Sequence, residues 1–299
     1  MILVTGASGL LGANLVMEAR SRSEKVLATF NKNPVHFPDV KCVQMDLRNE
    51  NQIKDVLMIY HPRCVIHCAA ITNVDWCEEH PSETKQIHEG VTRNLARIAN
   101  EIGSSMVYIS TDSVFDGKKG NYSEKDPPNP LNVYAKTKLE GEFAIKEELE
   151  KHLIIRTNIY GWNIQAKKSL GEWMLDQFER NNLFPGFRDV IFSPILVNDF
   201  SNIILDLLEK ETWGLLHVGS SIPCSKFEFG KCIAEIFNLN KDLIQPALID
   251  SIPFNAQRPK NTSLVVSKVQ KILMKDMPDV REGLTKFKKY RDTGYCTLL

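Results

Sequence analysis

The strongest constraint on the fold is an alternation, through the first half of the chain, of short β-branched runs with segments of helical periodicity. Helical patterns such as "LGANLVMEAR" (11–20) and "EGVTRNLARIANEIG" (89–103) separate these runs, and Gly103 is a plausible helix stop. Strands that alternate with helices predict βαβ units, right-handed crossovers and a parallel sheet. The sequence therefore predicts a doubly wound α/β domain. Its candidate strands are residues 2–5, 25–30, 41–46, 64–69, 105–110 and 152–157.

The rhythm loosens in the second half of the chain. Residues 192–210 favour a short strand and then a helix capped near Asn198 or Asp199, and "GLLHVG" (214–219) favours one more buried strand. Part of this half is therefore expected to return to the main sheet. We expect a main domain over residues 1–157 plus about 188–218, and a smaller, mixed α/β lobe over about 158–187 plus 219–299.

The glycine-rich segment "TGASGLLG" (5–12) directly follows the first expected strand and opens the first expected helix. Glycines allow a tight turn and a close approach to a pyrophosphate, and the helix N-terminus offers free N–H groups to the anion. The spacing is GxxGxxG and not the GxGxxG of the standard fingerprint, and a purely structural turn is the alternative. We expect a Rossmann-like dinucleotide site in the main domain, with the smaller lobe binding substrate. The expected cofactor contacts here are Gly6, Ser8, Gly9, Leu10, Leu11 and Gly12.

The end of the second expected strand bears on which dinucleotide binds. Folds that prefer NAD usually place a carboxylate there for the ribose 2′-OH. This chain has "ATFNKN" instead, with Asn31 and Lys32. A cation would favour the 2′-phosphate, so NADP(H) is favoured over NAD(H), although an ordinary solvated lysine is the alternative.

Composition argues against several other classes of function. Lysine plus arginine and aspartate plus glutamate both number 37, so no bulk attraction to nucleic acid or an anionic membrane is expected. The strand-like start and the lack of an apolar run of about 18 residues favour a cytoplasmic protein. Seven scattered cysteines without a CxxC pair indicate reduced thiols. Cys77 and His80 alone make a poor zinc site, so no metal is expected.

The segment "NVYAKTKLEGE" (132–142) places Tyr134 and Lys138 one helical turn apart on one face. Alone, this pair is most often part of an ordinary surface helix. It gains meaning from the motifs around it, which follow one another along nearly the whole chain. They are "TGASGLLG", "DL" (46–47), "CAAITNVDWCEEHP", "ISTDSVFDG", "PLNVYAKTKLEGE", "RTNIYG" and "AQRPKNTSLVVSK".

Together these motifs resemble the extended short-chain dehydrogenase/reductases, and within them the dTDP-4-dehydrorhamnose reductase branch. The resemblance implies that Thr111, Tyr134 and Lys138 are the catalytic residues. Because a free tyrosine has a pKa of about 10, a nearby ammonium would help it to exchange a proton. Tyr134 would protonate the substrate carbonyl oxygen, Thr111 would donate a hydrogen bond to it, and Lys138 would hold the nicotinamide ribose.

The resemblance also implies further contacts. Asn94 would belong to an active-site water network or be a buried polar residue, and Arg258 would bind a substrate phosphate or form a surface salt bridge. For the cofactor, the implied positions are Asp46, Leu47, Cys68, Ala69, Ala70 and Thr72, with Tyr134 and Lys138. For the substrate they are Val74, Asp112, Ser113, Asn158 and Arg258.

Departures from the family pattern concern the substrate pocket. Ser113 stands where the reductases usually have a tyrosine, and "RTNIYG" lacks their tryptophan, with Trp162 displaced. These changes place dTDP-rhamnose synthesis in doubt. Asp112 is followed by Ser113 and not by the glutamate that dehydratases use, which favours reduction over dehydration.

We therefore expect an NAD(P)H-dependent reductase of a 4-keto-deoxy nucleotide sugar, with a homodimer as its candidate assembly. Two alternatives stay open. One is a nucleotide-sugar 4-epimerase. The other is a non-catalytic dinucleotide-binding regulatory subunit, because the beta subunit of methionine adenosyltransferase resembles the same branch.

Overall fold

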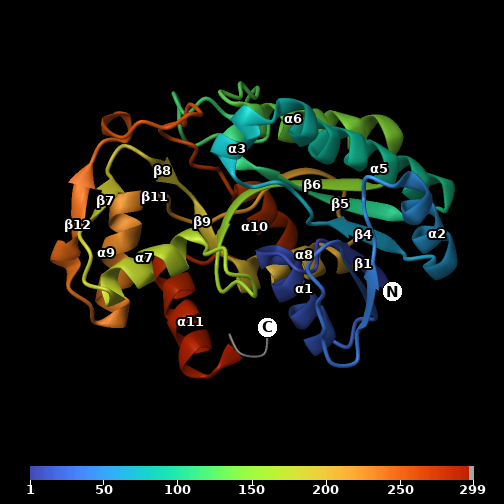
Figure 1. Ribbon diagram of the computed structural model, residues 1–299, viewed down its shortest axis with the longest axis horizontal. Coiled ribbons are helices and arrows are strands. Elements are labelled where there is room, and N and C mark those ends of the chain that lie inside the picture. Colours follow the sequence, from blue (N-terminus) through green and yellow to red (C-terminus); the bar gives the residue numbers. More distant parts are fainter. Residues whose placement is uncertain (296–299) are drawn as a thin grey trace.

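A central sheet of eight strands organises the protein, whose computed structural model describes residues 1–295 (Figure 1). Every pair of neighbouring strands in this sheet is parallel, in the order β10-β6-β5-β4-β1-β2-β3, and β9 pairs with the far end of β6. The predicted fold class is therefore confirmed. The strands are β1 (Ile2–Thr5), β2 (Val26–Phe30), β3 (Lys41–Gln44), β4 (Cys64–His67), β5 (Ser105–Thr111), β6 (His152–Tyr160), β9 (Pro194–Leu196) and β10 (Gly214–His217).

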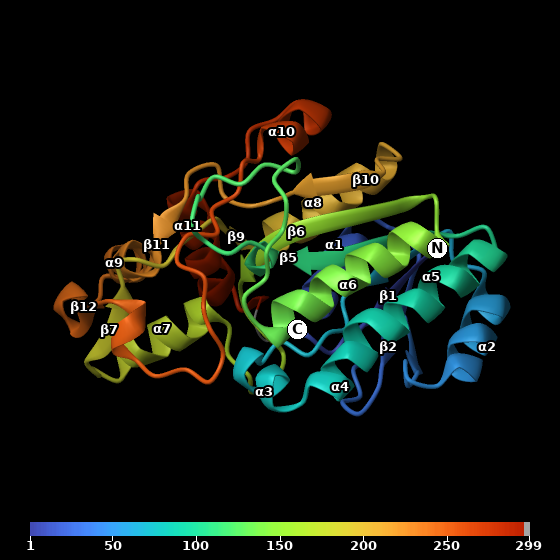
Figure 2. The same ribbon diagram turned by 90° about the horizontal axis from the view of Figure 1, so that it is seen from above.

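Helices cover both faces of the sheet. One face carries α1 (Leu10–Ser21) and α8 (Val197–Glu209), and the other carries α2 (Glu50–Tyr60), α5 (Val91–Glu101) and α6 (Val133–Glu148). Figure 2 shows α5 and α6 side by side along the sheet. The chain leaves β1 in one direction to β2 and β3, and in the other to β4, β5 and β6. Ligands of such sheets bind beyond the carboxyl ends of the strands where the order reverses, here between β1 and β4.

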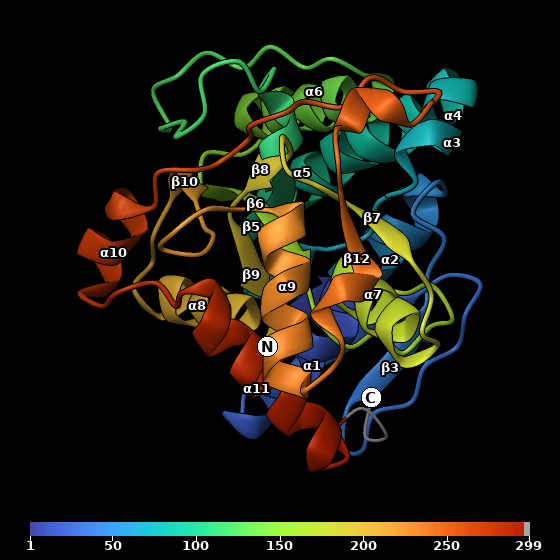
Figure 3. The ribbon, with the colours of Figure 1, turned by 90° about the vertical axis from the view of Figure 1, so that its left-hand side faces the viewer.

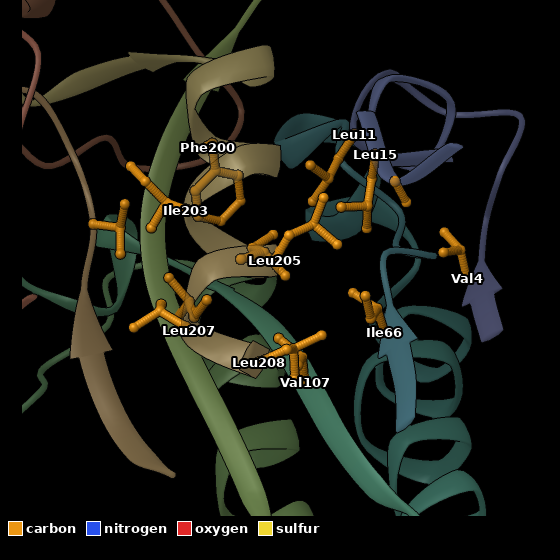
Figure 4. Close-up of a cluster of buried hydrophobic side chains, with 14 of the residues drawn as sticks. Val4, Leu11, Leu15, Ile66, Val107, Phe200, Ile203, Leu205, Leu207 and Leu208 are labelled. Atoms are coloured by element: carbon orange, nitrogen blue, oxygen red, sulfur yellow. The ribbon is translucent and has the colours of Figure 1, made fainter. Parts of the chain in front are cut away.

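Alternating side chains on the strands divide the core into two clusters. Val4, Ile66 and Val107 face α1 and α8, where a close-up shows them against leucines of both helices (Figure 4). Leu3 and Val65 point to the opposite face, toward α2 and α5. Since strands buried on both faces have apolar residues at successive positions, this explains the continuous apolar runs in the sequence. Complete burial of each such side chain contributes roughly 1.5–3 kcal/mol.

The second half of the chain adds a smaller group of elements beside the sheet (Figure 3). Two short two-stranded sheets pair β7 with β12 and β8 with β11. Buried aromatic rings, among them Phe178, Phe229 and Phe287, form their core. The elements are α7 (Leu170–Glu179), β7 (Phe184–Phe187), β8 (Ile191–Phe192), β11 (Cys224–Ser225), α9 (Lys226–Phe237), β12 (Ile244–Ala247) and α11 (Val280–Asp292). The lobe boundaries proposed from the sequence stay a prediction.

Short elements complete the chain. Between β4 and α5 lie α3 (Val74–Glu79), α4 (Pro81–Lys85) and one π-helical turn (Gln86–Gly90). The others are the 3₁₀ turns Asp112–Val114, Lys241–Leu243 and Ile249–Ser251, and α10 (Ser267–Leu273). No helix in residues 1–295 is long and apolar enough to cross a bilayer. The six cysteines in that range are free, and Cys296 lies outside the described residues.

The predicted cap of the helix in 192–210 is wrong. Helix α8 begins at Val197, its N-cap is Leu196, and no side chain caps it. The reason is that β9 runs into the helix without an intervening turn. Asn198 is used elsewhere, because its side-chain amide donates to Glu18 (3.0 Å) and to Asn14 (3.2 Å) of α1.

Candidate functional site

The glycine loop packs its backbone against the end of β4. Gly6 has a left-handed φ of +64°, and a Cβ added there would lie 2.8 Å from the backbone of Ala69. A Cβ on Gly12 would overlap the carbonyl oxygen of Gly6. Gly9, the N-cap of α1, supplies no side chain, and no acidic residue stands in the first turn of that helix. The loop therefore brings bare backbone N–H groups of Leu10 and Leu11 to the end of the sheet, as an anionic group requires.

The residues expected at the adenine end lie beyond β2 and β3. Lys32 is exposed, and the backbone carbonyl of Asn31 accepts a hydrogen bond from Gln44 (3.0 Å). The Arg48 guanidinium binds Asp46 at 2.7 Å and holds the pKa of that carboxyl below its usual range. A cavity of about 560 Å³, lined by Asp46, Arg48, Asn49, Glu50, Asn51 and Gln86, lies beside this pair.

Thr111 and Tyr134 meet at the carboxyl end of β5. Thr111 is the last residue of that strand, and Tyr134 lies in the first turn of α6. The helix starts there because Asn132 caps it by accepting from the Ala135 N–H (2.9 Å), while Glu78 accepts from the Val133 N–H (3.0 Å). Burial raises the pKa of Tyr134 to about 12, and a hydrogen bond with Thr111 opposes that rise. Tyr134 is therefore a neutral phenol near pH 7.

Lys138 follows Tyr134 by one turn and is only 3% exposed. Its ammonium lies 4.1 Å from the centre of the Tyr108 ring, a cation–π contact. Burial lowers the pKa of Lys138 to about 7, and the charge of Glu142 one turn further along α6 opposes this. Glu142 is itself bound to Arg156 by two hydrogen bonds, of 2.8 and 2.7 Å. A buried ion pair thus anchors α6 to β6.

Asp112, Ser113 and Asn158 form one hydrogen-bonded cluster beside Thr111. The buried carboxylate of Asp112 accepts from the Asn158 amide (3.0 Å), the Ser113 hydroxyl (3.3 Å) and the Thr111 hydroxyl (3.2 Å). Burial raises the pKa of Asp112, and these donors oppose the rise. A fourth donor, the Thr262 hydroxyl at 2.7 Å, was not expected from the sequence.

Thr262 belongs to a segment, residues 254–262, that we term the strap. Gln257 of the strap accepts a hydrogen bond from Asn132 at the start of α6 (2.8 Å). Arg258 forms an ion pair with Asp75 of α3 (2.7 Å), the salt bridge that the sequence left open as an alternative to phosphate binding. The strap therefore passes over the ends of α3, α6 and β5, and Val74 begins α3 beside it.

The segment 161–168 approaches the site from the other side. Gln165 donates to the backbone carbonyl of Ser8 in the glycine loop, and the Lys167 ammonium donates to the hydroxyl of Thr72. The segment 161–168 thereby links the glycine loop to the segment after β4 that holds Cys68 and Ala70. These contacts are not predictable from the sequence, since a glutamine and a lysine in a polar loop form no pattern of their own.

Two more side chains near the site were not expected. Lys226, half-buried at the start of α9, has a pKa lowered by burial and by the nearby charge of Arg258, while Asp112 opposes the shift. His88 lies edge-on to Tyr134, with ring centres 5.7 Å apart. It precedes Asn94, the polar residue expected in this region, by six positions.

Residues 1–291 match the model of the RmlD substrate binding domain family. The chain belongs to that family. It is thus an extended short-chain dehydrogenase/reductase of the dTDP-4-dehydrorhamnose reductase-like branch, as the sequence motifs predicted. Solved structures agree with this assignment. The dTDP-4-dehydrorhamnose reductase of Bacillus anthracis str. Ames in complex with NADP superposes with a TM-score of 0.85 at 29% identity, over 96% of this chain and 98% of that one.

Two curated relatives of this RmlD-family chain have different functions. The "Probable low-salt glycan biosynthesis reductase Agl14" of Haloferax volcanii is 29% identical over 94% of this chain and 95% of its own length. Methionine adenosyltransferase 2 subunit beta of Bos taurus is 32% identical over 95% of this chain and 85% of its own length. Both likenesses span nearly the whole fold.

Proposed function

We propose that this protein is an NAD(P)H-dependent reductase of a 4-keto-deoxy nucleotide sugar. The observation that carries the proposal is the contact of Tyr134 with Thr111 at the carboxyl end of β5, with Lys138 buried one helical turn beyond Tyr134. The phenol of Tyr134, the hydroxyl of Thr111 and the ammonium of Lys138 are groups suited to protonating a carbonyl oxygen. The likeness to a probable glycan biosynthesis reductase and to a dTDP-4-dehydrorhamnose reductase supports the same chemistry.

A nicotinamide dinucleotide fits the residues at the glycine loop. Packing of Gly6 against Ala69 and of Gly12 against Gly6 holds the loop backbone at the end of the sheet, and the first turn of α1 offers N–H groups to a pyrophosphate. When bound, the nicotinamide would supply the hydride. Lys32, near the end of β2, supports NADP(H) over NAD(H), as does the NADP in the Bacillus anthracis structure. Asp46 and Leu47 would border the adenine. The rest of the cofactor would be lined by Cys68, Ala69, Ala70 and Thr72.

The chain's own residues then handle the proton. Tyr134, protonated at neutral pH, donates its phenolic proton to the carbonyl oxygen of the substrate, while the Thr111 hydroxyl donates a hydrogen bond to the same oxygen. The ammonium of Lys138 on the same helix face favours the phenolate that Tyr134 leaves behind.

The substrate would enter between the strap and the smaller group of elements. Arg258 and Lys226 offer positive charge for the diphosphate of a nucleotide sugar, and Asp112, Ser113 and Asn158 offer hydrogen bonds to the sugar. Val74 would border the sugar. A cytoplasmic location and a homodimer also remain part of this proposal.

Absorbance of the reduced nicotinamide tests the reductase. The purified protein is mixed with NADPH, then NADH, and a panel of 4-keto-6-deoxy nucleotide sugars, with Tyr134→Phe as the matched variant. We expect oxidation of NADPH with one or more sugars, and a loss of at least about 100-fold in kcat in Tyr134→Phe. Turnover that survives in Tyr134→Phe would contradict the mechanism. Reaction without added cofactor would indicate the 4-epimerase instead.

A second candidate is a non-catalytic dinucleotide-binding regulatory subunit. The 32% identity to methionine adenosyltransferase 2 subunit beta over 95% of this chain favours it, and the fold alone does not decide between the two functions. A regulatory subunit would bind NADPH, show no turnover with any sugar, and form a complex with a methionine adenosyltransferase catalytic subunit in size-exclusion chromatography.

A further inference from the structure

His88 is a buried histidine held on a π-helical turn between α4 and α5. Only 1% of the residue is exposed. Its backbone is fixed from two sides, because the Thr92 hydroxyl donates to its carbonyl oxygen at 2.6 Å, and Gly141 of α6 packs directly against it. A Cβ on Gly141 would lie 2.6 Å from that oxygen. Since π turns re-aim side chains and occur often at functional sites, the orientation of His88 needs an explanation.

Both ring nitrogens of His88 bind parts of the proposed active site. Nδ1 lies 2.9 Å from the hydroxyl oxygen of Thr137 in α6, and Nε2 lies 3.1 Å from both the backbone nitrogen and the carbonyl oxygen of Ile71 in the segment after β4. When the Thr137 hydroxyl donates to the carbonyl of Val133 (2.8 Å), its oxygen accepts from Nδ1–H, and Nε2 accepts from the Ile71 N–H. In the other tautomer Nε2–H donates to the Ile71 carbonyl, and Nδ1 accepts from the Thr137 hydroxyl. Neutral His88 links Thr137 to Ile71 in either tautomer.

The imidazole of His88 is neutral near pH 7. Burial lowers the pKa of His88 to about 2, with the charge of Lys138 adding to the shift. His88 therefore does not take part in proton transfer at neutral pH. The chain of hydrogen bonds ends on a backbone carbonyl, so it does not relay a proton from Tyr134 either.

We infer that His88 is a positioning residue, which locks the cofactor-lining segment Cys68–Thr72 and the first turns of α6 into one geometry around Tyr134. Its ring lies at 83° to the Tyr134 ring, an edge-on contact that restricts the phenol. The inference rests on the proposed function and adds a residue to its site. A small displacement of a reacting group costs a large factor in rate, so loss of this link is expected to slow the reaction.

His217 provides the comparison that separates this role from ordinary burial. It is fully buried, and burial lowers its pKa to about 3. Its Nδ1 binds the carbonyl of Tyr122 (3.0 Å), while its Nε2 has no hydrogen-bond partner among residues 1–295. His217 lies in β10, the edge strand two positions from β5, and its ring packs edge-on against Phe115 with ring centres 5.6 Å apart. A variant there removes a buried imidazole without touching the proposed link.

The experiment compares His88→Leu, Thr137→Val, the double variant and His217→Leu. Thermal unfolding, the Kd for NADPH by fluorescence, and kcat with the sugar found in the panel are measured for each. We expect kcat to fall about tenfold and the NADPH Kd to rise about fivefold in His88→Leu and in Thr137→Val. The double variant is expected to be no worse than His88→Leu, because both changes break one link. His217→Leu should lower Tm and leave kcat and Kd at wild-type values.

Wild-type kcat and Kd in folded His88→Leu, or equal losses in His217→Leu, would overturn the inference. If His88→Leu fails to fold, Thr137→Val alone decides, because it removes only one hydroxyl. If the wild-type protein binds NADPH but reduces no sugar, the proposed function has failed. The NADPH Kd then still decides whether His88 braces the cofactor segment.

Discussion

The glycine loop and the strap lie on opposite sides of the proposed site, yet different interactions hold them. The glycine loop is held by backbone packing, since a Cβ at Gly6 or Gly12 would collide with main-chain atoms of Ala69 or of Gly6 itself. The strap is held by side chains, through Arg258 to Asp75, Asn132 to Gln257 and Thr262 to Asp112. The glycine loop depends on the absence of side chains, whereas the strap depends on pairs of polar groups that lie far apart in the sequence.

The two regions are therefore expected to differ in how well they tolerate substitution. Backbone packing leaves no room for substitution, because interiors are close-packed and the atoms involved cannot rotate away. A partly exposed ion pair such as Arg258–Asp75 contributes about 1 kcal/mol or less, so it can be exchanged with little loss of stability. The cofactor side is therefore expected to be rigid, and the substrate side to be the place where specificity varies.

The largest expected effect is on the glycine side. In Gly12→Ala the added methyl would overlap the Gly6 carbonyl oxygen, so the loop must shift. We expect a loss of roughly 3 kcal/mol in the free energy of unfolding, because overpacking against backbone cannot be relieved by a rotamer change. The affinity for NADPH should fall at least about 100-fold. Urea unfolding and fluorescence titration measure the two quantities.

Gly90→Ala is the matched control for that variant. Gly90 has helical backbone angles, and nothing lies within 4 Å of an added Cβ. Replacement should stabilise the protein by about 0.5–1 kcal/mol, since alanine has the higher helix propensity. A Gly12→Ala protein as stable as Gly90→Ala would show that the loop is not close-packed.

Lys138→Met is expected to have a smaller effect on stability and the opposite sign. The folded protein lowers the pKa of Lys138 from 10.5 to about 7, so burial disfavours its charged form. Between these values the unfolded chain binds a proton that the folded chain does not, so the cost of Lys138 to folding is complete below pH 7 and fades toward pH 10.5. We expect Lys138→Met to be more stable by ~1–2 kcal/mol at pH 6, and no more stable than wild type at pH 10.

The same variant should lose reductase activity at every pH, which makes Lys138 a residue kept for function at a cost in stability. Lys136 is an exposed lysine on the same helix, so Lys136→Met is the control. Its free energy of unfolding relative to wild type should be the same at pH 6 and at pH 10. If Lys138→Met is less stable than wild type at pH 6, the ammonium is stabilised by its contact with Tyr108 more than burial penalises it.

The parts that the sequence predicted well are those that local pattern determines. The parallel sheet follows from apolar strands alternating with helices, and the place of the glycine loop between β1 and α1 and of Tyr134 and Lys138 on one helix follows from spacings of a few residues. The strand limits differ slightly: β6 continues to Tyr160 and β3 already ends at Gln44. Pairing with β9 explains the extension of β6, because it supplies hydrogen bonds beyond Thr157.

The contacts that the sequence could not predict join residues far apart in the chain. Thr262 reaches Asp112 across 150 positions, Gln165 reaches Ser8 across 157, and His88 reaches Thr137 across 49. None of these residue types forms a periodic pattern, and each is common on ordinary surfaces. The helix start at Val197 was missed for a related reason, since Asn198 resembles a cap but binds α1 instead.

The smallest expected effect on stability is at the strap. The Arg258–Asp75 pair is partly exposed, so Arg258→Gln should cost less than about 1 kcal/mol of unfolding free energy. The KM for the nucleotide sugar should nevertheless rise about tenfold, because a guanidinium binds a phosphate through paired hydrogen bonds that glutamine cannot supply. The Kd for NADPH should stay at the wild-type value.

Arg281→Gln is the matched control, because Arg281 forms an exposed ion pair with Glu235 between α11 and α9, away from the strap. It should leave KM and the Kd for NADPH unchanged. Equal effects of the two arginine variants on KM would mean that Arg258 only closes a salt bridge with Asp75. A rise in KM confined to Arg258→Gln would place the diphosphate at the strap, and would show that the side of the site held by exchangeable polar pairs is the side that selects the substrate.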